Sequence, residues 1–332
     1  MEKNENDLGK KEITIIGYGE LLYDMFYDKN GVFEGMRAGG APINFVYHAA
    51  QNGAKGYAIS AICNDQKGKD ILKELKDNSI SSKYISIVDQ PTGTVRVNKL
   101  ENGHTFKINR SRKSSNNGED DAAWEYIPLT DASKELMKRA DAICFGTLAL
   151  QDTLSYETLK ELLKYAPEKT LRFFDINMRE KFYSEELIIE LLEMANVFKM
   201  NDAELAELRT MFHLKGTDNE ICRWFMDTYN LNYVILTAGA VCSTIYSRKE
   251  ISAIWTPADI VKEIADKAVA AGKPEPDSVG AGDSFSGTFV YSILAGDSLS
   301  EAHKKAVDVS AFVCTQVGAW PSYSNYSWKF GK

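Results

Sequence analysis

The chain has 332 residues, of which 44% are hydrophobic and 26% are charged, and its formal net charge at pH 7 is −8. This length and composition predict a globular protein with a large core, built as one big α/β domain or as two smaller ones. The acidic balance argues against nucleic acid as a partner, and the lack of about 18 consecutive apolar residues argues against a membrane span.

The chain begins with residues 1–11, which are polar and charged. This composition is unlike a secretory signal peptide and favours a flexible tail before the folded domain. The five cysteines are scattered without a Cys-x-x-Cys pair, so we expect reduced thiols and a cytoplasmic protein. The four histidines are also isolated, which argues against a zinc site or a Ser-His-Asp triad.

Short apolar runs alternate with amphipathic segments through most of the chain. Strands are predicted at Ile13–Ile16, Tyr57–Ile62, Ala142–Phe145, Leu171–Asp175, Val197–Met200 and Tyr233–Thr237. Helices are predicted at Ile43–Gln51, Lys69–Lys76, Ala132–Arg139, Ser155–Tyr165, Glu185–Met194, Ala203–Phe212, Ile221–Tyr229, Ser284–Leu294 and Leu299–Val317. This alternation implies right-handed crossovers and a mostly parallel sheet that is covered on both faces, which is an α/β fold.

Two stretches break this alternation because no helix separates their strands. Their strands are predicted at Leu21–Phe26, Val32–Met36, Thr94–Leu100 and His104–Ile108. Asn102-Gly103 between the last two runs is a strong hairpin signal. The two stretches predict a small sheet beside the main one, which would serve as a lid over a site or as a homodimer surface. The polar segment Ser111–Asp121 is predicted to be a mobile loop.

Glycines follow the first predicted strand at Gly17 and Gly19, but Leu22 occupies the third position of a dinucleotide-binding fingerprint. No helical pattern follows these glycines either, so the fingerprint is weak evidence. The chain also lacks a Gly-x-x-x-x-Gly-Lys-Ser/Thr phosphate loop. A phosphoryl-transfer enzyme with this sequence would therefore lie outside the P-loop class.

A second glycine motif, Gly39-Gly40-Ala-Pro-Ile-Asn44, opens a predicted helix. Its glycines let a ligand approach the backbone, and the Asn44 amide suits a sugar hydroxyl. Asp24 would accept hydrogen bonds from two neighbouring hydroxyls in the same way. The structural alternative, which has equal weight at this point, is a turn and a helix N-terminus with a solvated Asn44.

Polar motifs follow three later predicted strands, at the edge where open parallel sheets bind ligands. In Asp175-Ile-Asn-Met-Arg179, the arginine would reach a phosphate or form a solvated ion pair with the aspartate. In Asn201-Asp-Ala-Glu204, the glutamate would support a magnesium ion through water or close a capping box with the asparagine. Thr237-Ala-Gly239 is either a turn or part of a nucleotide pocket.

The most informative segment is Asp277-Ser-Val-Gly-Ala-Gly-Asp283, which directly precedes the apolar helical pattern Ser284–Leu294. Two glycines at a helix start leave backbone N–H groups uncovered, and such groups form an anion site. Asp283 places a carboxylate in the same site, where it would repel a resting phosphate. This combination suits phosphoryl transfer, with the carboxylate accepting a proton from the attacking hydroxyl. The alternative is a loop whose acidic residue is favoured by the helix dipole.

Taken together and in their order along the chain, these motifs resemble those of the ribokinase-like (PfkB) carbohydrate kinase family. The resemblance spans roughly Ile13 to Ser322. The 277–283 segment resembles the C-terminal signature of the family, and Gly39–Asn44 resembles its N-terminal glycine motif. The resemblance implies a single kinase domain over residues 12–330. The implied fold is a three-layer α/β/α sandwich with a mostly parallel sheet, and residues of about 20–38 and 92–116 would form a β-sheet lid.

The resemblance also implies a role for each motif. Asp283 would be the base, and the transferring phosphoryl group would be held by the N–H groups of Gly280, Ala281, Gly282 and Asp283. The sugar would be bound by Asp24, Gly39, Gly40, Asn44 and Arg179. The nucleotide would be bound by Lys199, Thr237 and Gly239. Mg²⁺ on ATP would be supported through water by Asn201 and Glu204. Some relatives use a K⁺ ion beside the signature loop, and carbonyls near Asp277 and Val279 would hold it here.

Within the family, Gly19-Glu-Leu-Leu-x-Asp24 and the Gly-Gly-Ala-Pro motif are most similar to fructokinases. The implied function is ATP-dependent phosphorylation of a sugar's primary hydroxyl, from fructose to fructose 6-phosphate. Ribose, 2-keto-3-deoxygluconate, a nucleoside or a sugar phosphate are alternative acceptors. An acidic acceptor would need basic lid residues, for which the candidates are Arg96, Lys99, Lys107, Arg110 and Arg112. A catalytically silent sugar-binding regulator is a further alternative, which the retained Asp283 disfavours.

Three features differ from the usual pattern of the family. Ser278 replaces the usual threonine but keeps a hydroxyl group. Cys242 stands where a glycine often follows the nucleotide motif, which leaves the shape of that loop open. The end of the chain, Trp320–Trp328, is unusually aromatic and is expected to pack in the core.

Overall fold

The computed structural model of the chain describes residues 12–100, 103–108, 122–151, 153–180 and 182–326. The predicted tail at 1–11 and the predicted loop Ser111–Asp121 lie outside the described residues, as does the end of the expected lid at 109–116. Among the basic residues named for the lid, Arg110, Arg112 and the side chain of Lys99 are also outside the described part.

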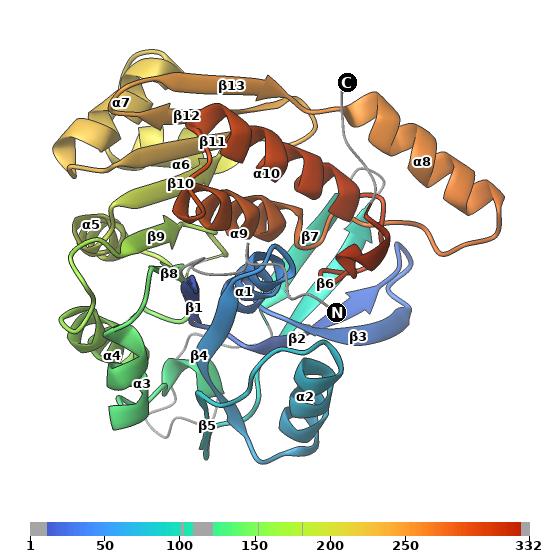
Figure 1. The fold of residues 1–332 in the computed structure, drawn as a ribbon. Helices are drawn as coiled ribbons and strands as arrows, with labels where there is room; N and C mark the ends of the chain where they lie inside the picture. The colour runs from blue at the N-terminus through green and yellow to red at the C-terminus, as the bar shows by residue number, and fades with distance from the viewer. Residues whose placement is uncertain (1–11, 101–102, 109–121, 152, 181, 327–332) are drawn as a thin grey trace, which may run out of the picture.

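The described residues form a nine-stranded central sheet with the order β13-β12-β11-β10-β9-β8-β1-β4-β5 (Figure 1). The strands from β11 to β5 pair in parallel, whereas β12 and β13 add an antiparallel edge. The bounds are β1 (Thr14–Tyr18), β4 (Lys55–Cys63), β5 (Ile85–Val88), β8 (Ala142–Phe145), β9 (Leu171–Asp175), β10 (Val197–Asn201), β11 (Tyr233–Ala238), β12 (Cys242–Ser247) and β13 (Ile251–Trp255). Every strand predicted for the main sheet is present, and its mostly parallel pairing is confirmed.

Helices cover both faces of this sheet. One face carries α1 (Ala41–Gln51), α2 (Gln66–Asp77), α9 (Ala281–Leu294) and α10 (Leu299–Val313). The other carries α3 (Asp131–Met137), α4 (Leu154–Leu163), α5 (Glu185–Met194), α6 (Asp202–Met211) and α7 (Asp218–Thr228). Neighbouring residues of a strand point to opposite faces, so Ile15 belongs to the core cluster that contains Phe45 and Phe289, whereas Ile16 belongs to the cluster that contains Leu159. The expected three-layer α/β/α sandwich is therefore confirmed.

The two stretches that break the α/β alternation form a second sheet with the order β3-β2-β6-β7. Its strands are β2 (Leu22–Tyr27), β3 (Phe33–Gly39), β6 (Thr94–Leu100) and β7 (Gly103–Ile108). The strand β2 pairs antiparallel with β3 and parallel with β6, and β6 pairs antiparallel with β7. The predicted small sheet is therefore present, and we call these four strands the small sheet.

Some elements were not predicted. They are β5, the edge hairpin β12–β13, the helix α8 (Ala258–Ala270) and two short 3₁₀ turns at Ala123–Glu125 and Tyr323–Asn325. The helix α8 has no buried residue and projects from the body in Figure 1; its apolar residues Val261, Ile264, Ala265 and Ala268 lie along one side and are only half-buried. The predicted helix Leu299–Val317 was too long, because α10 ends at Val313. Beyond it, Gln316 O accepts from Asp277 N at 3.0 Å, which ties the chain to the 277–283 loop.

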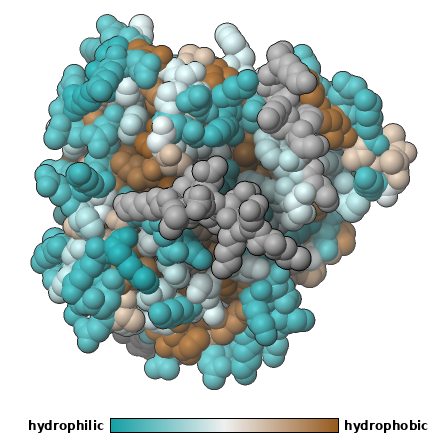
Figure 2. Space-filling view, viewed as in Figure 1, coloured by the Kyte–Doolittle hydropathy of each residue, from teal (hydrophilic) through white to brown (hydrophobic). Residues whose placement is uncertain are grey.

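The surface of the described part shows exposed apolar side chains at a few places. The largest exposed fractions are 77% for Trp255 on β13 and 61% for Val32 beside β3. On the face drawn in Figure 2, hydrophilic residues predominate and apolar residues form separate patches. Within the described ranges, no helix has the length and apolar character needed to cross a membrane.

Candidate active site

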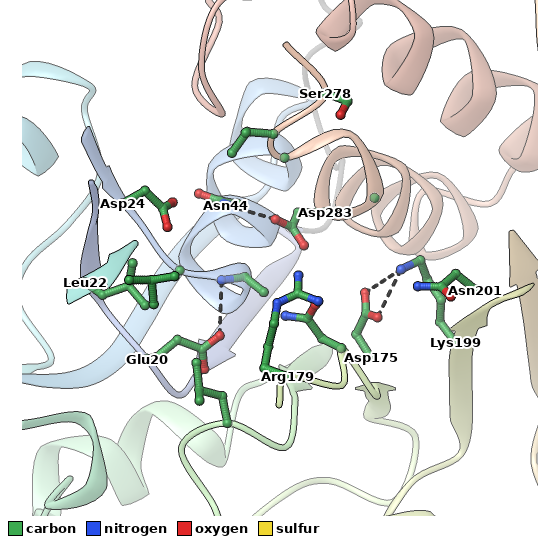
Figure 3. Close-up of a pocket in the computed structure, with 18 of the residues that line it drawn as sticks. Glu20, Leu22, Asp24, Asn44, Asp175, Arg179, Lys199, Asn201, Ser278 and Asp283 are labelled. Atoms are coloured by element: carbon green, nitrogen blue, oxygen red, sulfur yellow. Dashed lines mark hydrogen bonds and ion pairs between the residues drawn. The ribbon is translucent and has the colours of Figure 1, made fainter. Parts of the chain in front are cut away.

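A cavity of about 300 Å³ lies between the small sheet, the carboxyl ends of the central strands and the start of α9. This is the edge at which an open parallel sheet is expected to bind ligands. Figure 3 shows side chains from all three regions around it. The predicted site residues that line it are Asp24, Gly40, Asn44, Arg179, Lys199, Asn201, Glu204, Thr237, Val279, Gly280, Gly282 and Asp283. The predicted site residues that do not line it are Gly39, Gly239, Asp277 and Ala281.

The loop before α9 is shaped by Gly280, whose φ of 80° is left-handed. A Cβ at this position would lie 2.8 Å from the Cβ of Ala319, so both conformation and space require glycine. Ala281 N donates to a carbonyl within the loop at 3.2 Å. The amides of Gly280, Gly282 and Asp283 have no acceptor in the described part of the chain. Because they lie at a helix N-terminus, these amides form an anion site.

Asp283 lies in the first turn of α9, opposite Asn44 of α1 (Figure 3). Asn44 Nδ2 donates to Asp283 Oδ2 at 2.8 Å, and Trp320 Nε1 donates to Asn44 Oδ1 at 2.8 Å. The indole therefore fixes the orientation of the amide, whose N–H points at the carboxylate. Burial and the nearby Asp175 raise the pKa of Asp283 to about 6, although the Asn44 donor lowers it.

The end of the cavity next to the small sheet is acidic. On β2, Asp24 leaves no room for a side chain at Gly39, where a Cβ would lie 2.9 Å from Asp24 Oδ2. Glu20 follows β1, and its Oε1 accepts from Ala41 N at 3.3 Å, whereas its Oε2 is buried without a partner among the described residues. Burial raises the pKa values of Asp24 and Glu20 to about 7. Gly40 is equally constrained, because a Cβ there would lie 2.2 Å from the Glu20 carbonyl oxygen. We call this region the acceptor end.

The opposite end of the cavity, which we call the phosphoryl end, contains a buried ion pair. Lys199 Nζ of β10 lies 2.8 and 3.0 Å from the two carboxylate oxygens of Asp175, the last residue of β9. A Cβ at Gly282 would lie 3.5 Å from Lys199 Nζ, so the ammonium group lies against the anion site. Burial acts to lower the pKa of Lys199, but the Asp175 carboxylate outweighs burial, and the pKa is raised. Lys199 is therefore a cation at neutral pH.

Arg179 supplies a second positive charge to the cavity. Its guanidinium points into the cavity between Glu20 and Asp175 (Figure 3), and its Nη1 donates to Met178 O at 3.1 Å. The neighbouring residues Asn177 and Glu180 have positive φ angles of 41° and 46°. Non-glycine residues seldom adopt such angles, and they concentrate in loops that hold functional groups.

Asn201 and Glu204 form a capping box at the start of α6. Asn201 Oδ1 accepts from Glu204 N at 2.8 Å, and Glu204 Oε2 accepts from Asn201 N at 2.7 Å. Glu204 Oε1 also accepts from Met178 N at 3.0 Å, and burial raises the pKa of this carboxyl group. In the described ranges no three His, Cys, Asp or Glu side chains could hold a metal ion together. These hydrogen bonds use Asn201 Oδ1 and both carboxylate oxygens of Glu204, so a magnesium ion would have to be reached through water.

The carboxylate of Asp277 has a donor on each oxygen. Val279 N donates to Oδ1 at 3.1 Å, and Gly318 N donates to Oδ2 at 3.0 Å. Arg37 Nη1, from β3, also donates to Oδ2 at 3.1 Å and forms an ion pair with it. A potassium ion does not fit at this carboxylate, because it would share an oxygen with a guanidinium of the same charge.

The nucleotide motif lies at the carboxyl end of β11. Thr237 lines the cavity, and Gly239 follows the strand with a φ of 48°. Thr256 Oγ1 donates to the Gly239 carbonyl at 3.2 Å. Cys242 pairs with Ala238 in the β11–β12 hairpin, so this cysteine is the first residue of a strand that follows a short turn.

Several cavity residues had no predicted role. The apolar part of the wall is formed by Leu22, Val95, Ile108 and Leu148. Glu20 could have been suspected, because it lies four residues after the predicted strand Ile13–Ile16, at the edge of the sheet where ligands bind. Trp320 gave no signal, since its segment was expected only to pack in the core. Its contact with Asn44 joins residues that are 276 positions apart.

Comparison with known proteins agrees with this geometry. The model of the pfkB family of carbohydrate kinases matches residues 15–325. An ATP-dependent 6-phosphofructokinase of Thermoanaerobacterium thermosaccharolyticum is 25% identical over 93% of this chain and 90% of its own length. A 5-dehydro-2-deoxygluconokinase of Bacillus thuringiensis is 24% identical over 89% of this chain and 86% of its own length.

Solved structures share the fold. The crystal structure of a fructokinase from Xylella fastidiosa with bound ATP superposes with a TM-score of 0.74 at 20% identity, covering 92% of this chain and 94% of that one. At this identity the likeness concerns the fold, whereas the family match covers nearly the whole chain. The chain therefore belongs to the pfkB family of carbohydrate kinases and is an ATP-dependent sugar kinase.

Proposed function

We propose that the protein transfers the terminal phosphoryl group of ATP to the primary hydroxyl of a sugar, converting fructose to fructose 6-phosphate. The observation that carries this proposal is the position of Asp283. Its carboxylate stands between the anion site at the start of α9 and Asn44 at the acceptor end. A group placed there can take a proton from a hydroxyl while that hydroxyl attacks a phosphoryl group.

The sugar would bind at the acceptor end. Asp24 and the Asn44 amide would hold its hydroxyls, and Gly39 and Gly40 would let it approach the backbone. An aspartate with a pKa of about 6 is too weak a base to ionise a free hydroxyl beforehand. Asp283 would therefore accept the proton late, as the new O–P bond forms. The hydroxyl would need to lie within hydrogen-bond distance of the Asp283 carboxylate.

The nucleotide would bind along β10 and β11, with Thr237 and Gly239 beside it and its last phosphate at the loop 280–283. The Gly280, Gly282 and Asp283 amides and the Lys199 ammonium would then face the transferring group. These fixed donors would stabilise the charge that spreads over its oxygens in the transition state. Asn201 and Glu204 would hold Mg²⁺ through water, and the ion would neutralise phosphate charge.

A neutral acceptor suits the described residues better than an acidic one. At the acceptor end Asp24 and Glu20 outnumber Arg179, the one nearby cation among the described residues that line the cavity, so this end would repel a carboxylate or a phosphate when the two carboxyl groups are ionised. Arg96 of the small sheet cannot compensate, because its Nε donates to Asn98 Oδ1 at 2.7 Å and its guanidinium lies 3.4 Å from the Tyr27 ring centre. Lys107 neighbours the cavity residue Ile108 in β7 and therefore points to the other face of the small sheet. This charge pattern supports fructose over a sugar acid or a sugar phosphate.

A panel of acceptors at saturating ATP tests the proposal. Fructose should give the highest kcat/KM for ADP release, ahead of ribose, 2-keto-3-deoxygluconate, nucleosides and fructose 6-phosphate. The phosphorylated position of the product should be the primary hydroxyl, as shown by ³¹P–¹H correlation NMR. A higher kcat/KM for an acidic acceptor would refute the choice of fructose, and no turnover of any acceptor would refute the kinase assignment.

The same proposal extends to the organisation of the chain. We infer that residues 12–330 act as one kinase domain and that the segments 20–38 and 92–116, which contain the small sheet, close over the sugar as a lid. Closure would exclude water, so ATP hydrolysis should be much slower without sugar than transfer is with it.

All five cysteines are free of disulfides, which supports a cytoplasmic protein. The exposed Phe33 and Met36 of β3 support a homodimer through the lid, which light scattering of Phe33→Asp would test.

A further inference from the structure

An arginine of the small sheet reaches the start of the catalytic loop. Arg37 lies on β3, two residues before Gly39, and its Nη1 is 3.1 Å from Asp277 Oδ2. The guanidinium carbon lies 4.5 Å from the centre of the Phe26 ring, a cation–π contact with the neighbouring strand β2. A Cβ at Gly318 would lie 3.2 Å from Arg37 Cδ, so the absence of a side chain there leaves room for the arginine. Arg37 is therefore supported on three sides.

Asp277 in turn shapes the loop that forms the anion site. Its Oδ1 accepts from Val279 N, which closes a tight turn directly before Gly280. Its Oδ2 accepts from Gly318 N, which fixes the loop to the segment that leads to Trp320. The side chain of Asp277 is only 11% exposed, so its negative charge is poorly screened. A cation beside it would offset this charge next to a loop that must receive a phosphoryl group.

We propose that the Arg37 guanidinium supplies the positive charge at Asp277 that a bound monovalent cation would otherwise supply, so that phosphoryl transfer by this protein does not depend on K⁺. The kinetic part of this inference rests on the proposed function. Two cations at one carboxylate oxygen repel each other, so the arginine excludes the ion from Asp277. A covalently attached charge is present at every salt concentration and needs no binding step.

The arrangement has a second consequence. Arg37 is part of the small sheet, whereas Asp277 is part of the loop that leads into α9. The ion pair therefore joins the strand that ends at the sugar-binding glycines to the loop that would hold the phosphoryl group. Arg37 acts through Asp277 and does not line the cavity, so it is a positioning residue.

The kinetic experiment compares three chloride salts, KCl, NaCl and choline chloride, at equal ionic strength and constant Mg²⁺. Wild-type kcat should be the same within twofold in all three. For Arg37→Ala, kcat in choline chloride should fall about tenfold, the scale of one lost charge-assisted hydrogen bond. KCl should restore most of that loss, because the ion can now occupy the vacated carboxylate. Guanidinium chloride at a non-denaturing concentration should also restore it in the variant alone.

Cation binding is measured separately, without turnover, by ²⁰⁵Tl NMR with Tl⁺ as a probe for K⁺ and by thermal unfolding in the same salts. Arg37→Ala should bind Tl⁺ and gain stability in KCl over choline chloride, whereas the wild type should do neither. Arg37→Lys keeps a cation and should resemble the wild type. The matched control is Arg96→Ala, which removes another arginine of the small sheet that stacks on an aromatic ring and should show no cation dependence.

The outcomes separate the inference from the proposed function. A wild-type protein that binds Tl⁺ specifically, or whose kcat rises more than about tenfold with K⁺, would overturn the inference. An Arg37→Ala variant that neither loses kcat nor binds Tl⁺ would overturn it as well. If the wild type showed no kinase activity at all, the binding and unfolding measurements would still decide whether Arg37 occupies a cation position.

Discussion

The acceptor end and the phosphoryl end of the cavity differ in their charged side chains. At the acceptor end, Asp24 and Glu20 are carboxyl groups whose pKa values burial raises to about 7. At the phosphoryl end, Lys199 stays charged because the negative Asp175 carboxylate raises the pKa of its ammonium group. One end therefore favours neutral hydroxyls, and the other favours anions.

Asp283 belongs to both ends, because it lies in the first turn of α9 beside the anion site and accepts a hydrogen bond from Asn44. In the proposed reaction this one carboxylate has to lie near a phosphoryl group and still accept a proton. Burial and Asp175 raise its pKa, whereas Asn44 and the nearby cations Lys199 and Arg179 lower it. Substitutions at each end should therefore affect different kinetic constants.

The largest effect is expected at the junction of the two ends. Asp283→Asn keeps the shape of the side chain but removes the proton acceptor. We expect kcat to fall by at least about 10²-fold, the usual scale of general base catalysis, with little change in the KM for sugar or ATP. Stopped assays of ADP release measure the loss, and circular dichroism serves as the folding control. Near-normal turnover by a folded variant would show that Asp283 is not the base.

The next effect is expected at the phosphoryl end. Lys199→Met removes the buried cation beside the anion site and should lower kcat about 10²-fold, as loss of one transition-state donor does. Because the single change leaves Asp175 without its partner, the double variant Lys199→Met/Asp175→Asn is the control for stability. A double variant that folds and recovers full kcat would show that the ammonium group does not act on the phosphoryl group.

A smaller effect of a different kind is expected at the acceptor end. Asp24→Asn should raise the KM for sugar about tenfold, because hydrogen bonds to a carboxylate are stronger than those to an amide. The KM for ATP should stay within twofold of the wild type, since the proposed nucleotide site lies at the other end. An equal rise in both KM values would contradict the division of the cavity.

The pH dependence of the reaction tests the role of Asp283 without a substitution. An ordinary aspartate would stay ionised down to about pH 4, whereas Asp283 has a pKa of about 6. Because the base must be ionised, kcat at saturating sugar should fall as the pH drops through about 6, whereas kcat/KM should also fall through about pH 7 as Asp24 is protonated. An acid limb near pH 4 would show that burial does not raise the pKa of the base.

The smallest effect is expected for Trp320→Phe, which removes the indole N–H and keeps an aromatic ring. The Asn44 amide would lose its fixed orientation, and its bond to Asp283 would weaken. We expect a loss of about threefold in kcat/KM and an acid limb at higher pH, because the Asn44 donor lowers the pKa of Asp283. A loss without a shift of the acid limb would mean that Trp320 contributes packing alone.

Local patterns in the sequence were sufficient for much of the fold. The alternation of apolar runs and amphipathic helices predicted the main sheet, because strand and helix periods are properties of neighbouring residues. The capping box at Asn201 and Glu204 was one of two interpretations of its motif, and it could be named from the sequence because its two hydrogen bonds span three positions. Gly280 could likewise be understood from the local sequence, because the turn directly before α9 needs a left-handed φ at this position.

Contacts between residues that are far apart in the sequence could not be predicted from those patterns. The ion pair of Asp175 with Lys199 joins adjacent strands, and that of Arg37 with Asp277 spans 240 positions. The bond from Trp320 to Asn44 and the buried, unpartnered oxygen of Glu20 likewise depend on how distant segments pack. From local patterns one could predict six of the nine strands of the main sheet, the loop at the start of α9 and the residues with suitable chemistry. Only packing determined the partners and the pKa values of those residues, because charge and burial act through space.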